Sequence, residues 1–576
     1  MSDAARRPIR IANVSGFYGD RFAAARDMLA GPDDVDVLTG DYLAELTMLI
    51  LWKAQRRDPS AGYATTFLRQ LEEILGTCLD RGIKIVANAG GLAPLQLGER
   101  INELGARLGV SPAVAVVHGD DVRHMFADEG ALTANAYLGG WGIARGLAEG
   151  ADVIVTGRVT DAALVVGPSA WWHGWSPNDW DRLAGAVVAG HVIECGPQTT
   201  GGNYSFVKEL PDDRYPGFPI AEVADDGSCV ITKQPGTGGI VSVGTVTAQL
   251  LYEIGSPRYA NPDVVARFDT IALSGAGPDR VLLRGVRGEP APTQLKVALN
   301  STGGWRNSMT LVLTGLDIEA KARRAVAMLA EVLGGFEQFA AHHIELVRCD
   351  HTDASTNAAA TSQLRISVKD ANPDKVGRRF SGAVVELLLA SYAGAFASTP
   401  PRDASEYGVY RPAFVAVDLV QHAVLLPNGT SVVIPHPPAA EAIAVDAPAT
   451  PSAWSDDGPT RRVPLGTICG ARSGDKGGDA NVGLWTRSDD AYRWLRSNLT
   501  VDRFRSLLPE AERLVVHRHE FANLRALNFV VEGILGEGVA SSVRFDPQAK
   551  GLGEYVRARL VDVPERLIAD GDTGER

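Results

Sequence analysis

The stretch IKIVANAGGLAPLQLGERINELGARLGVSPAVAVVHG (residues 83–119) decides the fold. It opens with a short run rich in Ile and Val, continues with apolar residues at helical spacing over 94–107, and closes with a second run rich in Val. A strand, a helix and a second strand in this order form a βαβ unit, whose two strands lie parallel in one sheet. The stretch therefore predicts an α/β protein with a parallel core.

The same alternation continues on both sides of this stretch. The predicted strands are IRIANV (9–14), VDVL (35–38), IKIVANAG (83–90), AVAVVHG (113–119) and DVIVTG (152–157). The predicted helices between them span 41–57, 64–81, 94–107 and 139–149. Crossover helices of this kind make a large, mostly parallel α/β domain, and ligands bind such sheets at the carboxyl ends of the strands.

The rest of the chain predicts additions to this core and a second domain. Residues 196–245 are dense in Gly and Pro, which indicates loops and short strands. Further helices are expected over 241–254, 317–334 and 374–396. A stretch rich in Pro and Ala at 434–460 is typical of a linker, and the strands and helices beyond it indicate a small α+β domain. The predicted division is a first domain over 1–440, a linker over 441–462 and a second domain over 463–576.

Composition narrows the possible partners. The 576 residues include 56 basic and 69 acidic side chains, and the net charge of −13 argues against nucleic acid or an anionic membrane as the main partner. The N-terminus lacks the apolar segment of a secretory signal, and no apolar stretch reaches the about 20 residues that span a bilayer. Five scattered cysteines without a CxxC pair suit reduced thiols. We therefore expect a cytoplasmic protein.

Polar and glycine residues follow the predicted parallel strands. The candidate substrate-binding positions at this edge are Gly16, Asp41, Asn88, Gly90, Gly91, Arg158 and Asp161. Glycine lets a ligand approach the backbone, and arginine binds a carboxylate or phosphate with two hydrogen bonds. Each position also has a plain structural interpretation, as a tight turn, a helix cap or a local ion pair. Because parallel strands end at one edge of a sheet, the combination favours a single site.

The segment HVIECGPQTTGGNY (191–204) holds the densest group of reactive side chains. On a helix, His191 and Glu194 would share a face and work as an acid/base pair. Cys195 would be a nucleophile only if a positive charge or a helix N-terminus lowered its pKa, and is otherwise a small buried apolar residue. The candidate catalytic residues are His191, Glu194, Cys195 and Asp120, and Gly201 and Gly202 are further candidate substrate-binding positions.

A second glycine-rich segment, GARSGDKGGDAN (470–481), lies between two predicted strands of the small domain. Arg472 and Lys476 would flank a backbone nest that accepts a phosphate or carboxylate, while Asp475 and Asp479 would orient the lysine or a water. The alternative is a mobile surface loop.

No cofactor is predicted from motifs. The turn after the first strand is not GxGxxG and has no P-loop lysine, so it predicts no dinucleotide or ATP site and no redox cofactor. No closed set of metal ligands can be assembled from spacing. A divalent metal remains an alternative, with His118, Asp120, Asp121 and His124 as its ligands.

Several of these segments resemble those of a known family. The stretches are GDYLAELTM, NAGGLAP, TGRVTDAALVVGP, HVIECGPQTTGG, KQPGTGGIVSVGTVTAQLLYEIG and SGDKGGDANVG. They look like the signature segments of the acyclic terpene utilisation (AtuA) family. The resemblance implies an AtuA domain over about residues 8–445 and a ferredoxin-fold domain over about 463–565, and a role in the catabolism of branched acyl chains.

Two classes of function follow. The first is an enzyme that acts on a branched or terpenoid acyl-CoA, or on its free acid, as a hydratase, isomerase or lyase, with CoA as part of the substrate. A thioester hydrolase or transferase that uses Cys195 is a variant. The second class is a non-catalytic subunit that binds acyl-CoA or partners a carboxylase. In either case the acidic charge and the small domain are compatible with a homo-oligomer.

Overall fold

The computed structural model of the chain describes residues 6–438, 452, 454–455 and 458–571. It divides into two compact units. The first combines Met1–Asn300, Tyr410–Val539 and Asp546–Arg576, and the second combines Ser301–Val409 with Ala540–Phe545. The boundaries of these units differ from those of the predicted domains, because two long strands run from one unit into the other. Most of the predicted linker over 441–462 lies outside the described residues.

The first unit is built on an eleven-stranded sheet with the order β11–β12–β8–β7–β1–β2–β3–β6–β4–β19–β20. Its five central strands are parallel: β1 (Ile9–Asn13), β2 (Val37–Gly40), β3 (Lys84–Ala87), β6 (Val153–Thr156) and β4 (Val114–His118). The outer strands are antiparallel: β7 (Pro219–Val223), β8 (Cys229–Lys233), β12 (Val281–Arg284), β11 (Ala272–Gly275), β19 (Ala423–Leu425) and β20 (Ser431–Val433). The α/β class is confirmed, but the parallel arrangement holds only for the centre. The pairs β7–β8, β11–β12 and β19–β20 are each joined by a short turn, which permits antiparallel pairing.

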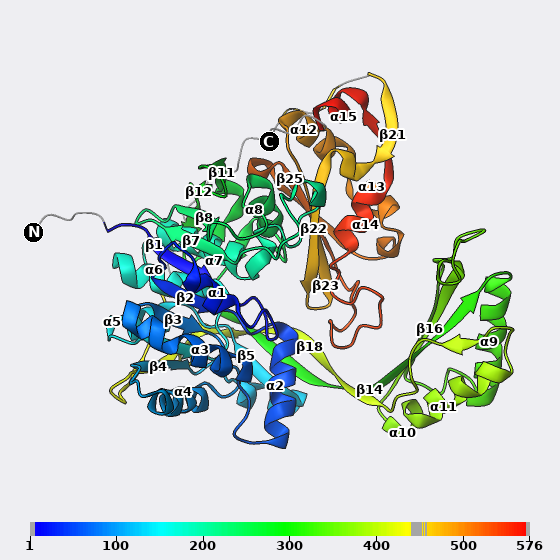
Figure 1. Cartoon of the computed structure of the whole chain (residues 1–576), viewed down its shortest axis with the longest axis horizontal. Helices are drawn as coiled ribbons and strands as arrows, with labels where there is room; N and C mark the ends of the chain where they lie inside the picture. The colour runs from blue at the N-terminus through cyan, green and yellow to red at the C-terminus, as the bar shows by residue number, and fades with distance from the viewer. Residues whose placement is uncertain (1–5, 439–451, 453, 456–457, 572–576) are drawn as a thin grey trace, which may run out of the picture. The chain divides into compact units, whose positions relative to one another are not determined.

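Helices cover both faces of the parallel centre. One face packs against α1 (Ala24–Ala30), α3 (Thr65–Arg81) and α4 (Pro94–Leu108). The other packs against α5 (Trp141–Ala148), α6 (Ala163–His173) and α7 (Trp180–Ile193). Leu38 and Ile85 point to the first layer, and Val37 and Val86 point to the second. Figure 1 shows α3 and α4 beside β3 and β4. The helices between the central strands lie close to their predicted positions, with α2 at Glu45–Arg57.

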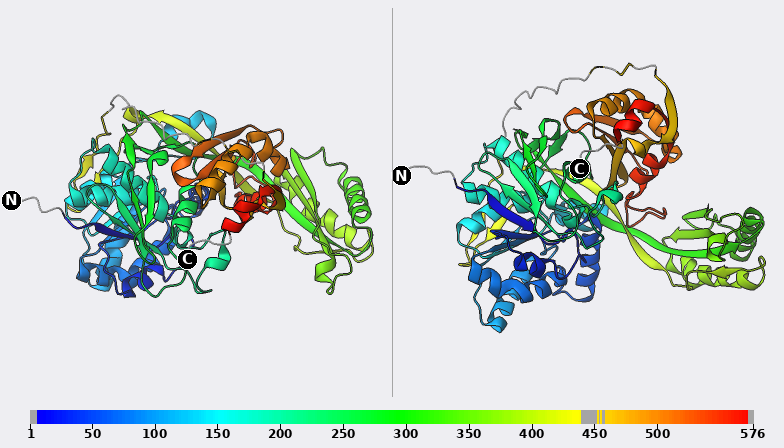
Figure 2. Two further views of the ribbon diagram at one scale, coloured as in Figure 1. Left: turned by 90° about the horizontal axis from the view of Figure 1, so that it is seen from above. Right: turned by 45° about the horizontal axis from the view of Figure 1, so that its top comes forward.

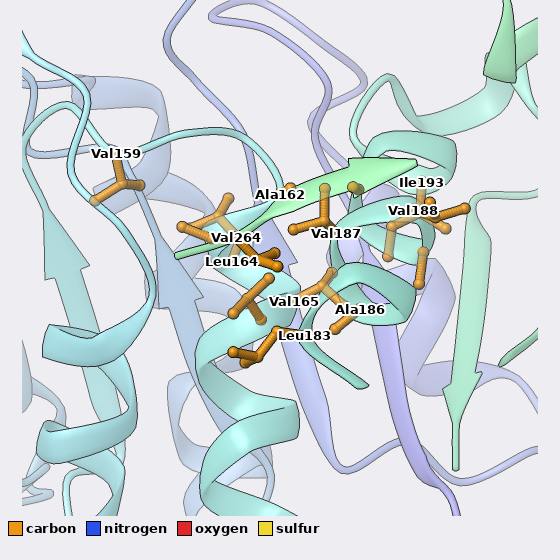
Figure 3. Packing of buried hydrophobic residues seen from close by; sticks show 14 of the residues in the cluster. Val159, Ala162, Leu164, Val165, Leu183, Ala186, Val187, Val188, Ile193 and Val264 are labelled. Carbon is orange, nitrogen blue, oxygen red and sulfur yellow. The ribbon is translucent and has the colours of Figure 1, made fainter. Parts of the chain in front are cut away.

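The last helix of the second layer, α7, is the most enclosed. Every residue from Leu183 to Ile193 is buried. Figure 3 shows Leu183 and Val187 of this helix beside Leu164 and Val165 of α6. Asn13 at the end of β1 fixes the C-terminus of α7, because its Nδ2 donates to the carbonyl oxygens of Ile193 (2.6 Å) and Glu194 (2.7 Å). The sheet thus sets the position of the segment that carries His191.

Further elements of the first unit complete the main body. The predicted helix over 241–254 is α8 (Val243–Leu250), whose cap Ser242 accepts a hydrogen bond from the Thr245 amide at 3.2 Å. A three-stranded sheet consists of β13 (Arg287–Glu289), β10 (Val265–Arg267) and β9 (Arg258–Ala260). Strand β5 (Ala131–Ala136) pairs with the long strand β14 (Gln294–Thr314).

The C-terminal part of the first unit is an antiparallel sheet with the order β22 (Cys469–Lys476), β23 (Asp479–Thr486), β25 (Ala526–Val531) and β24 (Val516–Phe521). Side chains on one face, such as Val482 and Phe529, pack against α12 (Asp489–Asn498), α13 (Val501–Leu507) and α14 (Leu552–Ala558). Strands β21 (Thr460–Pro464) and β26 (Leu560–Pro564) form a separate pair. The predicted glycine-rich turn is mostly strand, since only Gly477 and Gly478 separate β22 from β23.

The second unit contains part of β14 and an antiparallel sheet with helices. Its other strands are β15 (Ala341–Val347), β16 (Thr361–Asp370), β17 (Phe396–Ala397) and part of β18 (Ser405–Ala416). Its helices are α9 (Ile318–Leu333), α10 (Pro373–Val376) and α11 (Arg378–Glu386), which appear in green to yellow-green in Figure 2. The single long helix predicted over 374–396 is wrong. The non-helical backbone of Gly377 (φ −76°, ψ −134°) separates α10 from α11.

Among the residues that the structure describes, no helix combines the length and the apolar character needed to cross a bilayer.

The close approach of α7 to the β7–β8 turn makes one glycine a test of this packing. A Cβ on Gly185 would lie 1.9 Å from the Gly227 carbonyl oxygen, whereas a Cβ on Gly76 in α3 meets nothing within 4 Å. We expect Gly185→Ala to destabilise the protein by about 1–3 kcal/mol. Gly76→Ala should instead stabilise it by about 0.5–1 kcal/mol, because alanine restricts the unfolded chain. Thermal unfolding of both variants measures the difference, and equal shifts would contradict the packing.

Candidate functional site

Asp41 and Asn88 meet at the carboxyl ends of β2 and β3. Asn88 Nδ2 donates to Asp41 Oδ1 at 2.5 Å, and Asn88 Oδ1 accepts from the Tyr42 amide at 2.6 Å. Burial, followed by the negative charge of Asp161, raises the pKa of Asp41 well above its ordinary value. The two predicted strand-end residues are thus in direct contact and buried.

Arg158 follows β6 at the same edge and is only 1% exposed. Its guanidinium forms an ion pair with Asp161 and hydrogen bonds with the carbonyl oxygens of Leu43 and Val159. The ring of Tyr137 lies against it, with 4.4 Å between Cζ and the ring centroid. Asp161 is one-third exposed, so this ion pair lies at the boundary between the buried cluster and solvent.

Asp120, unlike the other candidate catalytic residues, hydrogen-bonds the loop that carries Arg158. Its Oδ2 accepts hydrogen bonds from Asn135 Nδ2 (2.7 Å) and from the Arg158 amide (2.9 Å). A Cβ on Gly157 would lie 2.2 Å from Asp120 Oδ1, so glycine is required beside this carboxyl. Burial raises the pKa of Asp120 to about 6. These bonds hold the loop that carries Arg158, which is a positioning role.

His191 lies in the last turn of α7, and Glu194 is the C-cap residue of this helix. His191 Nδ1 lies 3.2 Å from Glu194 Oε1, and the two residues are 1% and 8% exposed. His191 Nε2 lies 3.1 Å from the carbonyl oxygen of Gln249. A carbonyl can only accept, so Nε2 carries the hydrogen and Nδ1 presents a lone pair to Glu194.

The surroundings of this pair favour its uncharged form. Burial, and after it the charge of Lys476, lowers the pKa of His191 to about 4. Burial and the negative charges of Asp161 and Glu253 raise the pKa of Glu194 well above its ordinary value. Burial therefore favours the protonated carboxyl of Glu194 and the neutral imidazole of His191. Glu194 Oε2 is buried and makes no hydrogen bond, which leaves it available to a ligand.

Cys195 does not meet the condition for a nucleophile. Burial and the negative charge of Glu194 raise the pKa of its thiol well above the ordinary value, so the thiol stays protonated. Its backbone packs against the turn after β1, where a Cβ on Gly16 would lie 2.8 Å from the Cys195 carbonyl carbon. Gly16 is thus required for close packing of two segments of the site.

The other candidate glycines shape the loops around the cluster. A Cβ on Gly90 would lie 2.5 Å from the Thr156 carbonyl oxygen, and Gly91 has a φ of +52°. Gly202 donates from its amide to the Pro197 carbonyl oxygen at 2.9 Å, and Gly201 has a φ of +107°. Gly201 and Gly202 therefore stabilise the turn of their own loop.

The C-terminal sheet presents its second face to the end of α8. Asn481 Nδ2 donates to the Leu251 carbonyl oxygen (2.7 Å), and Asn528 Nδ2 donates to that of Ile254 (3.0 Å). The Glu253 amide donates to Asn481 Oδ1 at 2.9 Å. Glu253 has a left-handed backbone, with a φ of +53°. Such strain in a non-glycine residue persists only where its surroundings enforce it, and these side chains do so.

This contact brings the predicted C-terminal residues to the main body. Lys476 Nζ donates to the Glu253 carbonyl oxygen at 2.7 Å. Arg472 hydrogen-bonds Gln198 and lies with Cζ 4.1 Å from the Tyr252 ring centroid. The mobile-loop alternative does not fit this packing.

The two aspartates of the same segment have different neighbours. Asp475 Oδ1 lies 3.7 Å from Lys550 Nζ. Burial and the negative charge of Glu253 raise the pKa of Asp475 to about 7. Asp479 instead accepts a hydrogen bond from the Gly533 amide at 2.8 Å, so it orients a turn and not the lysine.

Several members of the cluster escaped the sequence analysis. Lys296 on β14 lies 3.5 Å from Glu45 Oε1 and 5.1 Å above the Tyr137 ring. Tyr410 on β18 is 7% exposed, with Lys296 Nζ 5.8 Å from its ring centroid. Glu253 and Lys550 were missed as well. Each stands alone in the sequence, and Glu253 lies within the predicted helix over 241–254, where nothing distinguished it from other helical residues.

These groups form one electrostatic cluster. The charge of Lys476 acts on His191 and Glu194, and the charge of Lys296 acts on Lys476, where it adds to burial in lowering the pKa. Strand-end residues, the α7 terminus and the C-terminal sheet therefore share one site. In the described part of the chain, no three His, Cys, Asp or Glu side chains are placed to hold a metal ion.

The fold and the cluster define an α/β protein whose polar site takes residues from the main body and from the C-terminal sheet of the first unit. A family model of the acyclic terpene utilisation family protein AtuA matches residues 9–426, and a model of the AtuA ferredoxin-like domain matches residues 463–562. The chain belongs to the AtuA family, as the sequence motifs predicted. Membership suggests a role in acyclic terpene utilisation. A search of curated proteins found no match.

The state of Cys195 can be tested by alkylation. All five cysteines are free, and Cys349 is exposed while Cys195 lies in the cluster. We expect iodoacetamide at neutral pH to label Cys349 first and to leave Cys195 unmodified until the protein unfolds, because only a thiolate reacts fast. Peptide mass mapping over time gives both rates, and Cys195 labelling as fast as Cys349 would restore the nucleophile hypothesis.

The raised pKa of Asp475 predicts a pH dependence of stability. The folded state holds this proton up to pH of about 7. The unfolded chain releases it near pH of about 4, so the native state binds more protons between these values and loses stability as pH rises. Asp475→Asn should remove this loss, and its melting temperature relative to the wild type should increase across the window. Parallel curves for the two proteins would contradict the assignment.

Proposed function

We propose that this protein is an enzyme that acts on a branched or terpenoid acyl-CoA, or on the corresponding carboxylate, by acid/base chemistry of the hydratase, isomerase or lyase type. The observation that carries the proposal is the buried pair of Glu194 and His191, in which a carboxyl group whose protonated form is favoured by burial lies 3.2 Å from an imidazole nitrogen with a free lone pair. Family membership supports the substrate class.

The pair can exchange protons without leaving a net charge in the site. Glu194 donates its proton to a substrate oxygen or carbon and becomes a carboxylate. His191 then accepts a proton from the substrate or from water through Nδ1, and the imidazolium is stabilised by that carboxylate 3.2 Å away. In a buried site this neutrality avoids the large cost of an isolated charge. Reactions in which one proton enters and another leaves fit this exchange.

The remaining polar groups suit substrate binding. Arg158 offers a fixed positive charge next to Asp41 and Asn88, which supports a role in holding a carbonyl or carboxylate. Arg472 and Lys550 add positive charge from the C-terminal part, and both lie against the ring of Tyr252. The CoA moiety would belong to the substrate and not to a resident cofactor.

Replacement of the acid tests the proposal. Turnover of branched acyl-CoA thioesters, saturated, unsaturated and hydroxylated, and of their free acids is followed by chromatography and mass spectrometry. Glu194→Gln should lower turnover by about 10²–10⁴-fold, the usual contribution of a general acid, while binding measured by calorimetry persists. Glu512→Gln, which changes an exposed glutamate, is the control and should not affect turnover.

The alternative outcome identifies the other class of function. Saturable binding of acyl-CoA without turnover in the wild type, and unchanged in Glu194→Gln, would make the protein a binding or carboxylase-partner subunit. The homo-oligomeric state and the cytoplasmic location stay predictions from the sequence.

A further inference from the structure

Lys476 and Arg472 are the two cations of the cluster that form no ion pair with a carboxylate of the described chain, and of these two only the lysine can lose its proton. Arg158 pairs with Asp161, Lys296 with Glu45 and Lys550 with Glu253. Lys476 Nζ donates one hydrogen bond, to the backbone carbonyl oxygen of Glu253, and forms no ion pair with any carboxylate of the described chain. A partly buried ammonium without a counter-ion is costly, and loss of its proton relieves that cost.

A second lysine strengthens this effect. Lys296 is held in place by Glu45 and by the ring of Tyr137, and it keeps its own charge because these two groups favour it. Burial, and after it the charge of Lys296, lowers the pKa of Lys476. An amine that is desolvated and placed beside another cation is the arrangement that makes lysine a nucleophile at neutral pH.

The backbone around Lys476 fixes where its amine lies. The segment leaves β22 with Gly477 and Gly478, and a Cβ on Gly477 would lie 3.2 Å from the Tyr410 ring. Its hydrogen-bond acceptor, the Glu253 carbonyl, belongs to the strained residue that Asn481 holds at a φ of +53°. The amine is thus held on rigid elements where its charge acts on Glu194, as expected of a reacting group and not of a surface lysine.

We propose that Lys476 is a catalytic nucleophile whose amine forms an imine with a carbonyl group of the substrate. This inference rests on the proposed function and narrows it to carbonyl substrates, such as 3-oxo acids or their thioesters, and to lyase chemistry at the bond next to the imine carbon. An iminium ion withdraws electrons from that bond, which is how lysine amines assist carbon–carbon cleavage.

Imine formation requires only the substrate and proton-carrying groups of the site. The neutral Nζ adds its electron pair to the carbonyl carbon, and one amine proton passes to the carbonyl oxygen to give a carbinolamine. Glu194 donates a second proton to that oxygen, which leaves as water. The products are an iminium ion that retains one N–H, the Glu194 carboxylate and one water molecule. Cleavage of the bond next to the imine carbon leaves its electron pair as an enamine and releases the other fragment, which is carbon dioxide from a 3-oxo acid. Protonation of the enamine carbon by water restores the iminium ion, and hydrolysis by the reverse of imine formation releases the product.

Reductive trapping on the full-length protein tests the proposal. Acetoacetate, a simple 3-oxo acid, is added with sodium cyanoborohydride, which reduces an imine to a stable secondary amine, and the modified lysines are identified by peptide mapping. Lys476 should be labelled much faster than the exposed Lys208, since each unit by which a pKa falls raises the neutral fraction about tenfold. Equal labelling of the two lysines would overturn the proposal.

A matched pair of variants tests the role of the second lysine. Lys296→Met removes the neighbouring cation and should shift the pH dependence of Lys476 labelling to higher pH, whereas Lys296→Arg keeps the cation and the wild-type profile. Identical profiles for both variants would contradict the mechanism. Lys476→Arg, which keeps the charge but cannot form an imine, should lose label and turnover. If Lys476→Arg does not fold, the peptide mapping of the wild type and the two Lys296 variants still test the proposal.

The two proposals fail in different ways. If Glu194→Gln abolishes turnover while Lys476 is never labelled, the acid/base enzyme stands and the imine is excluded. If Lys476 is labelled selectively while Glu194→Gln has full turnover, the imine stands and the role of Glu194 as the acid is excluded.

Discussion

The burial of one guanidinium constrains the whole site. Arginine remains charged in a protein, so Arg158, which is 1% exposed, must find partners on all sides. They come from separate segments: the Leu43 carbonyl after β2, Asp161 and the Tyr137 ring. These contacts tie the segments that follow β2 and β6 to one another around a single charge. The same charge acts on Asp41 and Glu194.

The charges around Arg158 then set the protonation of their neighbours. Burial and the negative charges of Asp161 and Glu253 raise the pKa of Glu194. Burial and the charge of Lys296 lower the pKa of Lys476, against the carboxylates of Glu253, Glu45 and Glu194. Both shifts favour fewer buried charges. The surroundings thus favour the uncharged forms of the groups on which the proposed acid/base and imine chemistry depends.

The sequence predicted those parts of this structure that depend on local pattern. The βαβ core was visible because each strand and helix carries its own periodicity, and HVIEC was visible because its reactive residues are adjacent. Lys296, Glu253 and Lys550 were not, since each reaches the site only through pairing of distant segments. The glycines of β22 were misread as a turn. A Cβ on Gly470 would lie 2.4 Å from the Trp485 ring and one on Gly474 would lie 2.5 Å from Tyr252, so packing and not turning requires them.

The same packing shows that the two family-matched segments are parts of one site. One face of the C-terminal sheet is apolar and packs on its own helices, while the other carries Asn481 and Asn528, which hydrogen-bond the end of α8. If the domain were independent, a sheet face with amide side chains would be exposed to solvent. Here it places Lys476 against Glu253. Without that contact Lys476 would lose its hydrogen-bond acceptor, and the main body would lose the charge that acts on His191 and Glu194.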